Sequence, residues 1–353
     1  MRNRTGDLFS RARREEKLVQ FTGVLDRLEH LVDWTGLAAA VNAATGREAA
    51  RPQGGRPPYP TVALLKVVVL QQLYGNLSDE QMEYALLDRL SWQRFIGMAD
   101  ARDLPDARTL WAFKNLIAGG GGAQALFGEV SHQLARAGLT AKGGQLIDAT
   151  IVEVPKTRVS DQSRERLNNG ETPAHWDAKR IAHTDGDARW TMEHGKWFYG
   201  DKGHINADQK HKLIRAIEVT PANVDDRVPL EKLIDADAVR LASGKTVHAD
   251  KGYDAKATRE LLKARGLRDG VARKDDAQRY DQTGNQRRNK KLSRIRARVE
   301  HVFGGWEKTM GKRLRSIGET RAKSMIVVQA TVYNLRRWVT LDARIEGRGA
   351  SSA

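Results

Sequence analysis

The chain has no cysteine among its 353 residues. Disulfides, thiolate zinc sites and cysteine nucleophiles are therefore excluded together. Its nine histidines form no His-x3-His or His-Glu-x-x-His pair. Because zinc sites on helices commonly use such pairs, a histidine-based zinc hydrolase is not indicated.

Long apolar runs are also missing. The longest, residues 62–70, is interrupted by Lys66 and is far shorter than the roughly 20 residues that span a bilayer. The amino terminus, Met-Arg-Asn-Arg-Thr-Gly-Asp, lacks the apolar segment of a signal peptide. We therefore expect a cytoplasmic protein with no membrane partner.

Acidic residues are fewer than basic ones. The chain has 44 of the former and 60 of the latter, a formal charge of +16 and a pI near 10.0. Lysine and arginine drive sequence-independent binding to nucleic acid by releasing its counterions. The composition thus predicts a polyanionic partner.

Three carboxylates follow patterns typical of metal-dependent phosphodiester chemistry. Asp148 ends the run 143–148, Asp250 ends the run 245–250, and Glu300 lies in a basic helical stretch. Two acids at strand ends and one on a later helix can converge on one point. Mg²⁺ prefers oxygen ligands, and two such ions about 3.5–4 Å apart can activate an attacking oxygen and stabilise a leaving one.

Each of these acids also has a plainer interpretation. An aspartate after a strand is often a turn former, and Glu300 could simply pair with Arg296 one helical turn away. The positive field around Glu300 favours the metal interpretation, because an uncovered acid on a DNA-binding face opposes phosphate binding. Other acids that compete by position are Glu153, Asp201, Asp208 and Asp254.

The amino-terminal third reads as helical. Apolar spacing predicts a helix over 13–44, irregular structure over 45–60, and a helix over 61–74 that Gly75-Asn76 breaks. Ser78 with Gln81 forms a capping box for a helix over 79–90. A third helix follows Pro105-Asp106 and carries Arg108 and Lys114. This region is either a helix-turn-helix DNA reader or a plain bundle with solvated charges.

The sequence from Gly119 onward indicates an α/β fold. Gly119–Gly122 indicates a joint or tight bend before a helix that ends at Gly138. Strands are expected at 145–154, 196–205, 212–220 and 246–249, with helices near 229–240 and 255–266. We expect a mobile loop over 274–290 and a disordered tail from 341. The predicted units are residues 1–118, 119–139, 140–340 and 341–353.

Four ordered blocks carry a family resemblance: 148–155, 197–204, 248–253 and 296–303. With 55–66 and 77–81 they resemble the bacterial IS-five family of insertion-sequence transposases, over most of residues 10–338. The resemblance implies a ribonuclease-H-like catalytic domain (a mixed sheet with flanking helices) behind a helical DNA-binding domain. It also implies an Asp-Asp-Glu catalytic and metal-binding triad of Asp148, Asp250 and Glu300.

One block departs from the family pattern Tyr-x2-Arg-x3-Glu-x6-Lys. Arg296 and Glu300 match, but Ser293 replaces the tyrosine and Lys308 comes one residue late, behind Glu307. A one-residue slip rotates a helical side chain by about 100°. Lys308 therefore misses the family position unless Gly304-Gly305 ends the helix.

The resemblance implies a transposase of the bacterial nucleoid that uses two Mg²⁺ ions, with Mn²⁺ as a substitute. It would bind the terminal inverted repeats of its element as a homodimer or larger assembly, cleave the ends and join their 3′-hydroxyls to target DNA. Two alternatives are a nuclease of the same fold without strand transfer and an inactive DNA-binding regulator. Candidate DNA-binding residues are Arg108, Lys114, Lys202, Lys251, Lys290, Lys291, Arg294, Arg296, Arg298 and Lys308.

Overall fold

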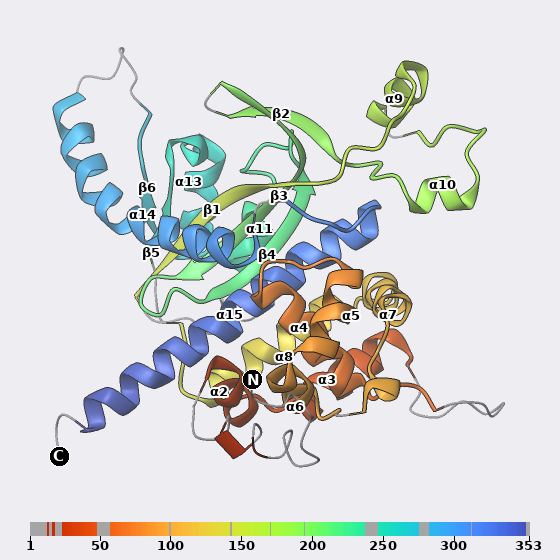
Figure 1. Ribbon diagram of the computed structural model, residues 1–353. Helices are drawn as coiled ribbons and strands as arrows, with labels where there is room; N and C mark the ends of the chain where they lie inside the picture. Colours follow the sequence, from red (N-terminus) through yellow and green to blue (C-terminus); the bar gives the residue numbers. More distant parts are fainter. Residues whose placement is uncertain are drawn as a thin grey trace, which may run out of the picture.

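A layer of short helices and a mixed β-sheet lie on opposite sides of one long carboxyl-terminal helix (Figure 1). The computed structural model describes residues 13, 16–17, 23–47, 57–98, 100–141, 143–169, 171–193, 195–236, 246–274, 282–311 and 313–350.

The helical layer is built from seven helices of the described chain. They are α2 (Val24–Leu31), α3 (Trp34–Thr45), α4 (Thr61–Leu73), α5 (Asp79–Asp88), α6 (Leu90–Ile96), α7 (Ala107–Gly119) and α8 (Gly122–Arg136). A short 3-10 turn, η1 (Ala101–Asp103), precedes α7.

The single helix expected over 13–44 is wrong within the described residues. Val32 is extended and Asp33 starts a new helix, with its side chain accepting a hydrogen bond from the Gly36 N–H. The cap formed by Asp33 thus divides the region into two helices, although the apolar spacing continues through it. Residues 14–15 and 18–22 of that prediction lie outside the described residues.

The predicted start signals further along are confirmed. Ser78 and Gln81 form the capping box of α5, and Asp106 caps α7 by accepting from the Thr109 N–H. The helix expected over 79–90 ends two residues early, and α6 then follows directly.

Helix α4 lies at the centre of the helical layer rather than on its surface. Nearly every residue from Thr61 to Gln72 is buried, the pattern of a helix that is enclosed on all sides. Lys66 is buried too, with its Nζ 2.8 Å from Glu29 Oε1 and beside the rings of Trp34 and Phe95. These contacts offset the cost of burying a lysine and favour the bundle interpretation for α4.

The glycine run at 119–122 is a tight bend between two packed helices. Gly121 has φ +69°, and a Cβ on Gly120 would lie 2.8 Å from Thr45 Cα. Only glycine fits both positions, because one is left-handed and the other touches backbone. Helix α8 therefore packs directly on α3 and α15.

The sheet has six described strands. They are β1 (Gly144–Glu153), β2 (Arg189–Glu193), β3 (Lys196–Asp208), β4 (Ile214–Pro221), β5 (Thr246–Ala249) and β6 (Arg268–Val271). The order is β4-β3-β1-β5-β6, and β2 pairs with the first half of β3. The first three strands of this order are antiparallel neighbours, whereas β5 and β6 add in parallel to β1. All four predicted strands are present.

Strands β1 and β3 approach each other unusually closely at one end. A Cβ on Gly200 would lie 2.1 Å from the Val152 carbonyl oxygen, so a side chain there would force the strands apart. Glycine at this position keeps the long antiparallel register from Gln145 opposite Asp208 to Glu153 opposite Gly200.

Helices cover both faces of the sheet. Helices α11 (Leu230–Asp235) and α13 (Lys256–Ala264) share a small core with one face, and α14 (Gln282–Met310) with α15 (Glu319–Ala350) share the main core with the other. Two short helices, α9 (Asp161–Asn168) and α10 (Ala178–Ala182), lie in the connection from β1 to β2, and the 3-10 turn η2 (Lys251–Tyr253) follows β5. Strand β2 and helices α9 and α10 were not expected.

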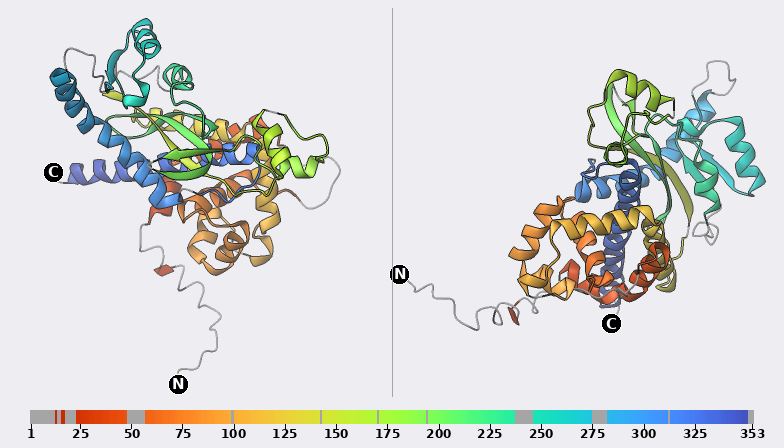
Figure 2. Two further views of the ribbon diagram at one scale, coloured as in Figure 1. Left: turned by 90° about the horizontal axis from the view of Figure 1, so that it is seen from above. Right: turned by 90° about the vertical axis from the view of Figure 1, so that its right-hand side faces the viewer.

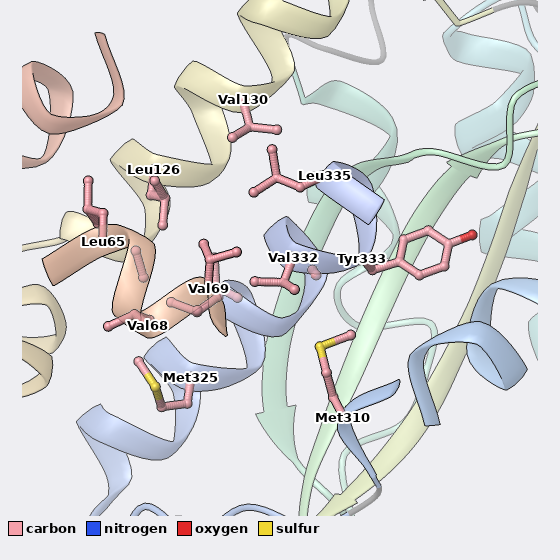
Figure 3. Packing of buried hydrophobic residues seen from close by; sticks show 14 of the residues in the cluster. Leu65, Val68, Val69, Leu126, Val130, Met310, Met325, Val332, Tyr333 and Leu335 are labelled. Carbon is pink, nitrogen blue, oxygen red and sulfur yellow. The ribbon is translucent and has the colours of Figure 1, made fainter. Parts of the chain in front are cut away.

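Helix α15 runs between the helical layer and the sheet in Figure 1 and in the right-hand view of Figure 2. Its residues 324–335 are all buried. Figure 3 shows the packing of α15 with α4, α8 and the end of α14. The labelled residues of this core are Leu65, Val68, Val69, Leu126, Val130, Met310, Met325, Val332, Tyr333 and Leu335.

Two expected irregular regions contain helix instead. Residues 282–290 of the predicted loop begin α14, where Arg288 donates to the Val271 carbonyl and Asn289 bonds the backbone of Arg273. Tertiary hydrogen bonds therefore order a segment that composition marks as polar. The expected tail from 341 continues α15 to Ala350. Residues 237–245, 275–281 and 351–353 lie outside the described chain.

In the part of the chain that the structure describes, we find no helix with the length and apolarity needed to cross a membrane.

The polar centre of α15 provides a stability test. Gln329 is fully buried, accepts from Trp306 Nε1 at 3.0 Å and donates to Gln72 Oε1 at 3.2 Å. Gln329→Leu should lower the free energy of unfolding by about 2–4 kcal/mol, since each buried polar group left unpaired costs roughly 1–3 kcal/mol. Urea denaturation followed by circular dichroism measures the change.

Gln286→Leu, at an exposed position of α14, is the matched control and should have little effect. Equal stability of the two variants would show that the Gln329 contacts do not hold the layers together.

Candidate functional site

Strand register brings Asp148 and Asp250 side by side. Leu146 pairs with His248 across the parallel strands β1 and β5. Two residues further along each strand, Asp148 is level with Asp250, whose backbone is still extended (φ −79°, ψ −178°). Neighbouring strands lie about 4.8 Å apart, and equal steps along parallel strands keep side chains on one face. The two acids are thus neighbours, although Asp148 lies within β1 and not at its end as expected.

Backbone groups orient both carboxylates. Asp148 Oδ1 accepts from the Ala149 N–H at 3.0 Å, and Asp250 Oδ1 accepts from the Gly252 N–H at 2.7 Å. Burial raises the pKa of Asp148 to about 7, and the nearby carboxylates of Asp250 and Asp226 raise it too, against lowering effects of the Ala149 N–H and Arg296. Ionisation of Asp148 therefore costs free energy, because its carboxylate is buried and close to other carboxylates.

Glu300 lies on α14 but at the exposed edge of its apolar stripe. Val299 and Val302 are buried against the core, and Glu300, one residue on from Val299, is turned by about 100° and exposed. Arg296, one turn earlier, is half-buried and close enough to lower the pKa of Asp148. Among the described residues, no ion pair joins Arg296 to Glu300.

The carboxylates of the site fit a metal ion as a pair and not as a group of three. Within the described ranges, no three carboxylates or histidines lie close enough together to hold one ion. The structure brings together Asp148 and Asp250 and does not place Glu300 in a group of three with them among the described residues. The pair itself fits a hard divalent cation, because its donors are carboxylate oxygens and a cation would relieve the mutual repulsion that helps to raise the pKa of Asp148.

Asp226 and Tyr253 were not anticipated at this site. The Asp226 carboxylate raises the pKa of Asp148, and Asp226, Asp148 and Asp250 all raise the pKa of the buried Tyr253 hydroxyl, after burial itself. Asp226 also accepts from Lys202 Nζ at 2.9 Å. Asp226 lies in a loop, so no strand or helix period in the sequence identified it.

The acids that competed by position belong elsewhere. Asp208 is buried against Arg215, and Asp254 pairs with Arg259 and Arg273. Asp201 is fully buried, and its pKa is raised to about 8 by burial and by Asp185. The ion pairs of Asp208 and Asp254 indicate structural roles, whereas both carboxylate oxygens of Asp201 are buried without a hydrogen-bond partner in the described structure.

The basic residues proposed for DNA binding divide into three groups by exposure. Lys114 and Lys202 are mostly buried and bonded to Asp79 and Asp226, which argues against direct phosphate contact. Arg296 is half-buried at the acids. Exposed residues are Arg108, Lys251, Lys290, Lys291, Arg294, Arg298 and Lys308. Helix α14 continues past Gly304-Gly305 to Met310, so the glycines do not correct the position of Lys308.

Sequence families agree with this architecture. A family described as "Transposase DDE domain" matches residues 140–335, and one described as "Transposase domain" matches residues 13–116. The first match spans more than half of the chain. The protein therefore belongs to the DDE transposases, enzymes that cleave DNA and transfer its strands with the help of divalent metal ions.

Among solved structures, the chain is similar to the piggyBac transposase in a synaptic complex with hairpin DNA, determined by cryo-electron microscopy. The sequences are 10% identical, the alignment covers 90% of this chain and 73% of that chain, and the TM-score is 0.45.

The raised pKa of Asp148 predicts a pH-dependent stability. Between its unfolded pKa near 3.9 and its folded value of about 7, the folded state binds more protons, so stability falls as pH rises through this range. In metal-free buffer at pH 8, Asp148→Asn should raise the free energy of unfolding by roughly 1–3 kcal/mol, with little gain at pH 4. Thermal melts across this range measure it.

Glu165→Gln, at an exposed site of α9, is the control and should leave the profile of the parent protein unchanged. A gain from Asp148→Asn that is the same at both pH values would contradict the assigned cause.

Proposed function

We propose that this protein is an IS-five-type transposase that binds the terminal inverted repeats of its element, cleaves the ends and joins their 3′-hydroxyls to target DNA. The adjacency of Asp148 and Asp250 across β1 and β5 carries the proposal. The strand order, with three antiparallel strands extended by two parallel ones, supports a ribonuclease-H-like catalytic domain.

Asp148, Asp250 and Glu300 are proposed to hold two Mg²⁺ ions, for which Mn²⁺ can substitute. When bound, such ions activate the attacking oxygen and stabilise the leaving oxygen. The protein contributes the orientation of its carboxylates, through the Ala149 and Gly252 N–H groups. Glu300 must approach the aspartates for this role, and it lies one helical turn from Arg296, which already acts electrostatically on Asp148.

Helix α14 is the proposed DNA-binding face beside the acids. Lys290, Lys291, Arg294 and Arg298 are exposed on it, and the helix contacts both β1 and β5. Phosphates that bind along α14 would therefore pass close to Asp148 and Asp250. Synapsis of two element ends requires at least two catalytic domains, which supports a homodimer or larger assembly.

One observation favours a different candidate function. Glu300 does not group with the two aspartates among the described residues, as expected for an inactive DNA-binding regulator. Magnesium-dependent nicking of the element ends separates the two functions, and joined products separate a transposase from a plain nuclease.

Isosteric variants test the triad. Asp148→Asn, Asp250→Asn and Glu300→Gln keep the side-chain shape but remove the anionic oxygen that a hard cation requires. Each should abolish Mg²⁺-dependent strand cleavage, by a factor of about 10³ or more, while DNA affinity is kept or increased because a negative charge has gone. Gel assays of cleavage and binding on the same DNA measure both effects.

Glu153→Gln is the matched control, since Glu153 lies on β1 at the far end from Asp148, and it should cleave normally. Wild-type cleavage by Glu300→Gln would remove Glu300 from the site and leave the two aspartates with an unidentified third ligand.

Salt dependence tests the DNA-binding face. Wild-type affinity for duplex DNA should fall by roughly 10³ or more between 50 and 200 mM salt. Combining Lys290→Ala, Lys291→Ala and Arg294→Ala should reduce the slope of log affinity against log salt by about 3, because each phosphate that a basic side chain neutralises adds roughly 0.9 to the slope. Fluorescence anisotropy titrations at several salt concentrations give the slopes.

The control combines Lys232→Ala, Lys256→Ala and Lys263→Ala, which removes the same charge from α11 and α13 on the opposite face of the sheet. If both triple variants reduce the slope equally, overall charge and not the α14 face governs binding.

A further inference from the structure

The carboxylate of Asp201 lies in the main core without a hydrogen-bond donor. Asp201 is directly opposite Val152 on the neighbouring strand β1, so its side chain lies on the same face of the sheet as Val152, which belongs to the core shared with α15. The side chain is fully buried, and neither oxygen has a hydrogen-bond partner in the described structure. Ionisation in such a place is so unfavourable that a carboxyl group holds a proton instead.

A second carboxyl group with the same deficiency lies beside Asp201. Asp185, in the connection between β1 and β2 (residues 154–188), is 4% exposed, and its Oδ1 accepts from the N–H groups of Asp187 and Ala188. Its Oδ2 is buried without a partner among the described residues. After burial, the Asp185 carboxylate is the largest cause that raises the pKa of Asp201, because the two groups are close together. Three buried acceptor oxygens thus meet without a donor from the described chain.

The cation nearby is bonded to other acids. Lys323 of α15 donates to Asp187 Oδ2 and, at 2.8 Å, to Glu319 Oε1. It lowers the pKa of Asp185 and of Asp201, but supplies no hydrogen bond to the three unpartnered oxygens in the described structure. The other titratable and charged groups that act on the pair, or on the tyrosine beside it, are Asp187 before β2, Glu319 and Lys323 of α15, Tyr199 of β3, Arg164 of α9 and Arg189 of β2.

The connection between β1 and β2 has little other buried surface near its helices. Among the described residues of α9 and α10, only Ser163 is buried. The connection is joined to the rest of the molecule where Asp187 bonds Lys323 and where Asp185 meets Asp201. A segment with few buried contacts opens more readily than the core of a protein, so the state of this carboxyl pair affects whether the connection stays in place.

We propose that Asp185 and Asp201 share one proton in a carboxyl–carboxylate hydrogen bond, and that this proton fastens the connection between β1 and β2 to β3. The protonated oxygen of one side chain donates to an oxygen of the other, so the pair keeps a single negative charge beside Lys323. When the connection lifts away, both carboxyl groups reach water and the proton leaves. The connection is therefore fastened at acidic pH and loosens as the pH rises.

The pH range of this response follows from the two pKa values. An exposed aspartate has a pKa near 3.9, whereas burial and the Asp185 carboxylate raise the pKa of Asp201 to about 8. Between these values the closed state holds one proton more than the open state, so opening becomes up to about tenfold more favourable for each unit of pH. Above about pH 8 both states have lost the proton, and the effect levels off.

Hydrogen–deuterium exchange followed by mass spectrometry measures the opening in the full-length protein. Exchange is recorded in EDTA and without DNA, so the result is independent of the proposed transposase activity. Each rate is divided by the intrinsic exchange rate at the same pH. In the wild type, peptides from the connection should lose protection by up to about tenfold per pH unit between about pH 5 and 8, and no further above that.

Two amide variants remove the shared proton without removing a donor. In Asp201→Asn and in Asp185→Asn the new amide N–H can donate to the remaining carboxylate at every pH. The connection should then keep the same protection from about pH 5 to 8, and either variant serves if the other folds poorly. Glu165→Gln, at an exposed position of α9 in the same connection, is the matched control and should keep the pH response of the wild type.

Infrared spectroscopy detects the proton directly, because a protonated carboxyl group and a carboxylate absorb at different frequencies. The difference spectrum between the wild type and Asp201→Asn at neutral pH should contain the band of a protonated carboxyl group, which a purely structural role would not produce. Protection of the connection that is independent of pH in the wild type, or a pH response that persists in both amide variants, overturns the proposal. So does protection at pH 8 that Mg²⁺ restores in the wild type and not in the amide variants, which would assign the pair to a cation.

Discussion

The whole arrangement depends on the buried central part of α15. Its residues 324–335 are enclosed by the helical layer and the sheet, so neither part has a complete core without it. Polar side chains on this helix have fixed partners: Gln329 contacts Gln72 and Trp306, and Asn334 bonds the backbone of Ile214. Because these bonds form in a nonpolar surrounding, they fix how the helical layer and the sheet are positioned relative to α15.

This constraint positions the candidate active site. Trp306 is held by Gln329, and Val299 and Val302 pack in the same core, so α14 has a fixed rotation over β1 and β5. Its remaining surface then carries Arg296 toward the acids and basic residues toward solvent. The aspartates lie on adjacent strands, where mutual repulsion and burial are sustained by the surrounding fold. Such a pair of carboxylates lowers the stability of the folded protein and is maintained for its chemical function.

The antiparallel pairing of β1 with β3 holds the strand that carries Asp148. Within this ladder Asp148 lies opposite Ile205, and the pairing continues to Glu153 opposite Gly200. Gly200 allows the close approach of the two strands at that end. Since a paired β ladder does not change length, the position of Asp148 on β1 is fixed relative to β3.

The sequence by itself determined the helix caps at Ser78 and Asp106, the four expected strands and the apolar stripe of α14, because these depend on neighbours within a few residues. Membership of the DDE transposases also followed from ordered motifs. Tertiary structure alone decided that Asp226 lies near Asp148 and that Lys202 and Lys114 are bonded to acidic residues of the same chain. It also ordered residues 282–290 and extended α15 past residue 341. Such outcomes depend on contacts between residues distant in sequence, for which local periodicity and composition hold no signal.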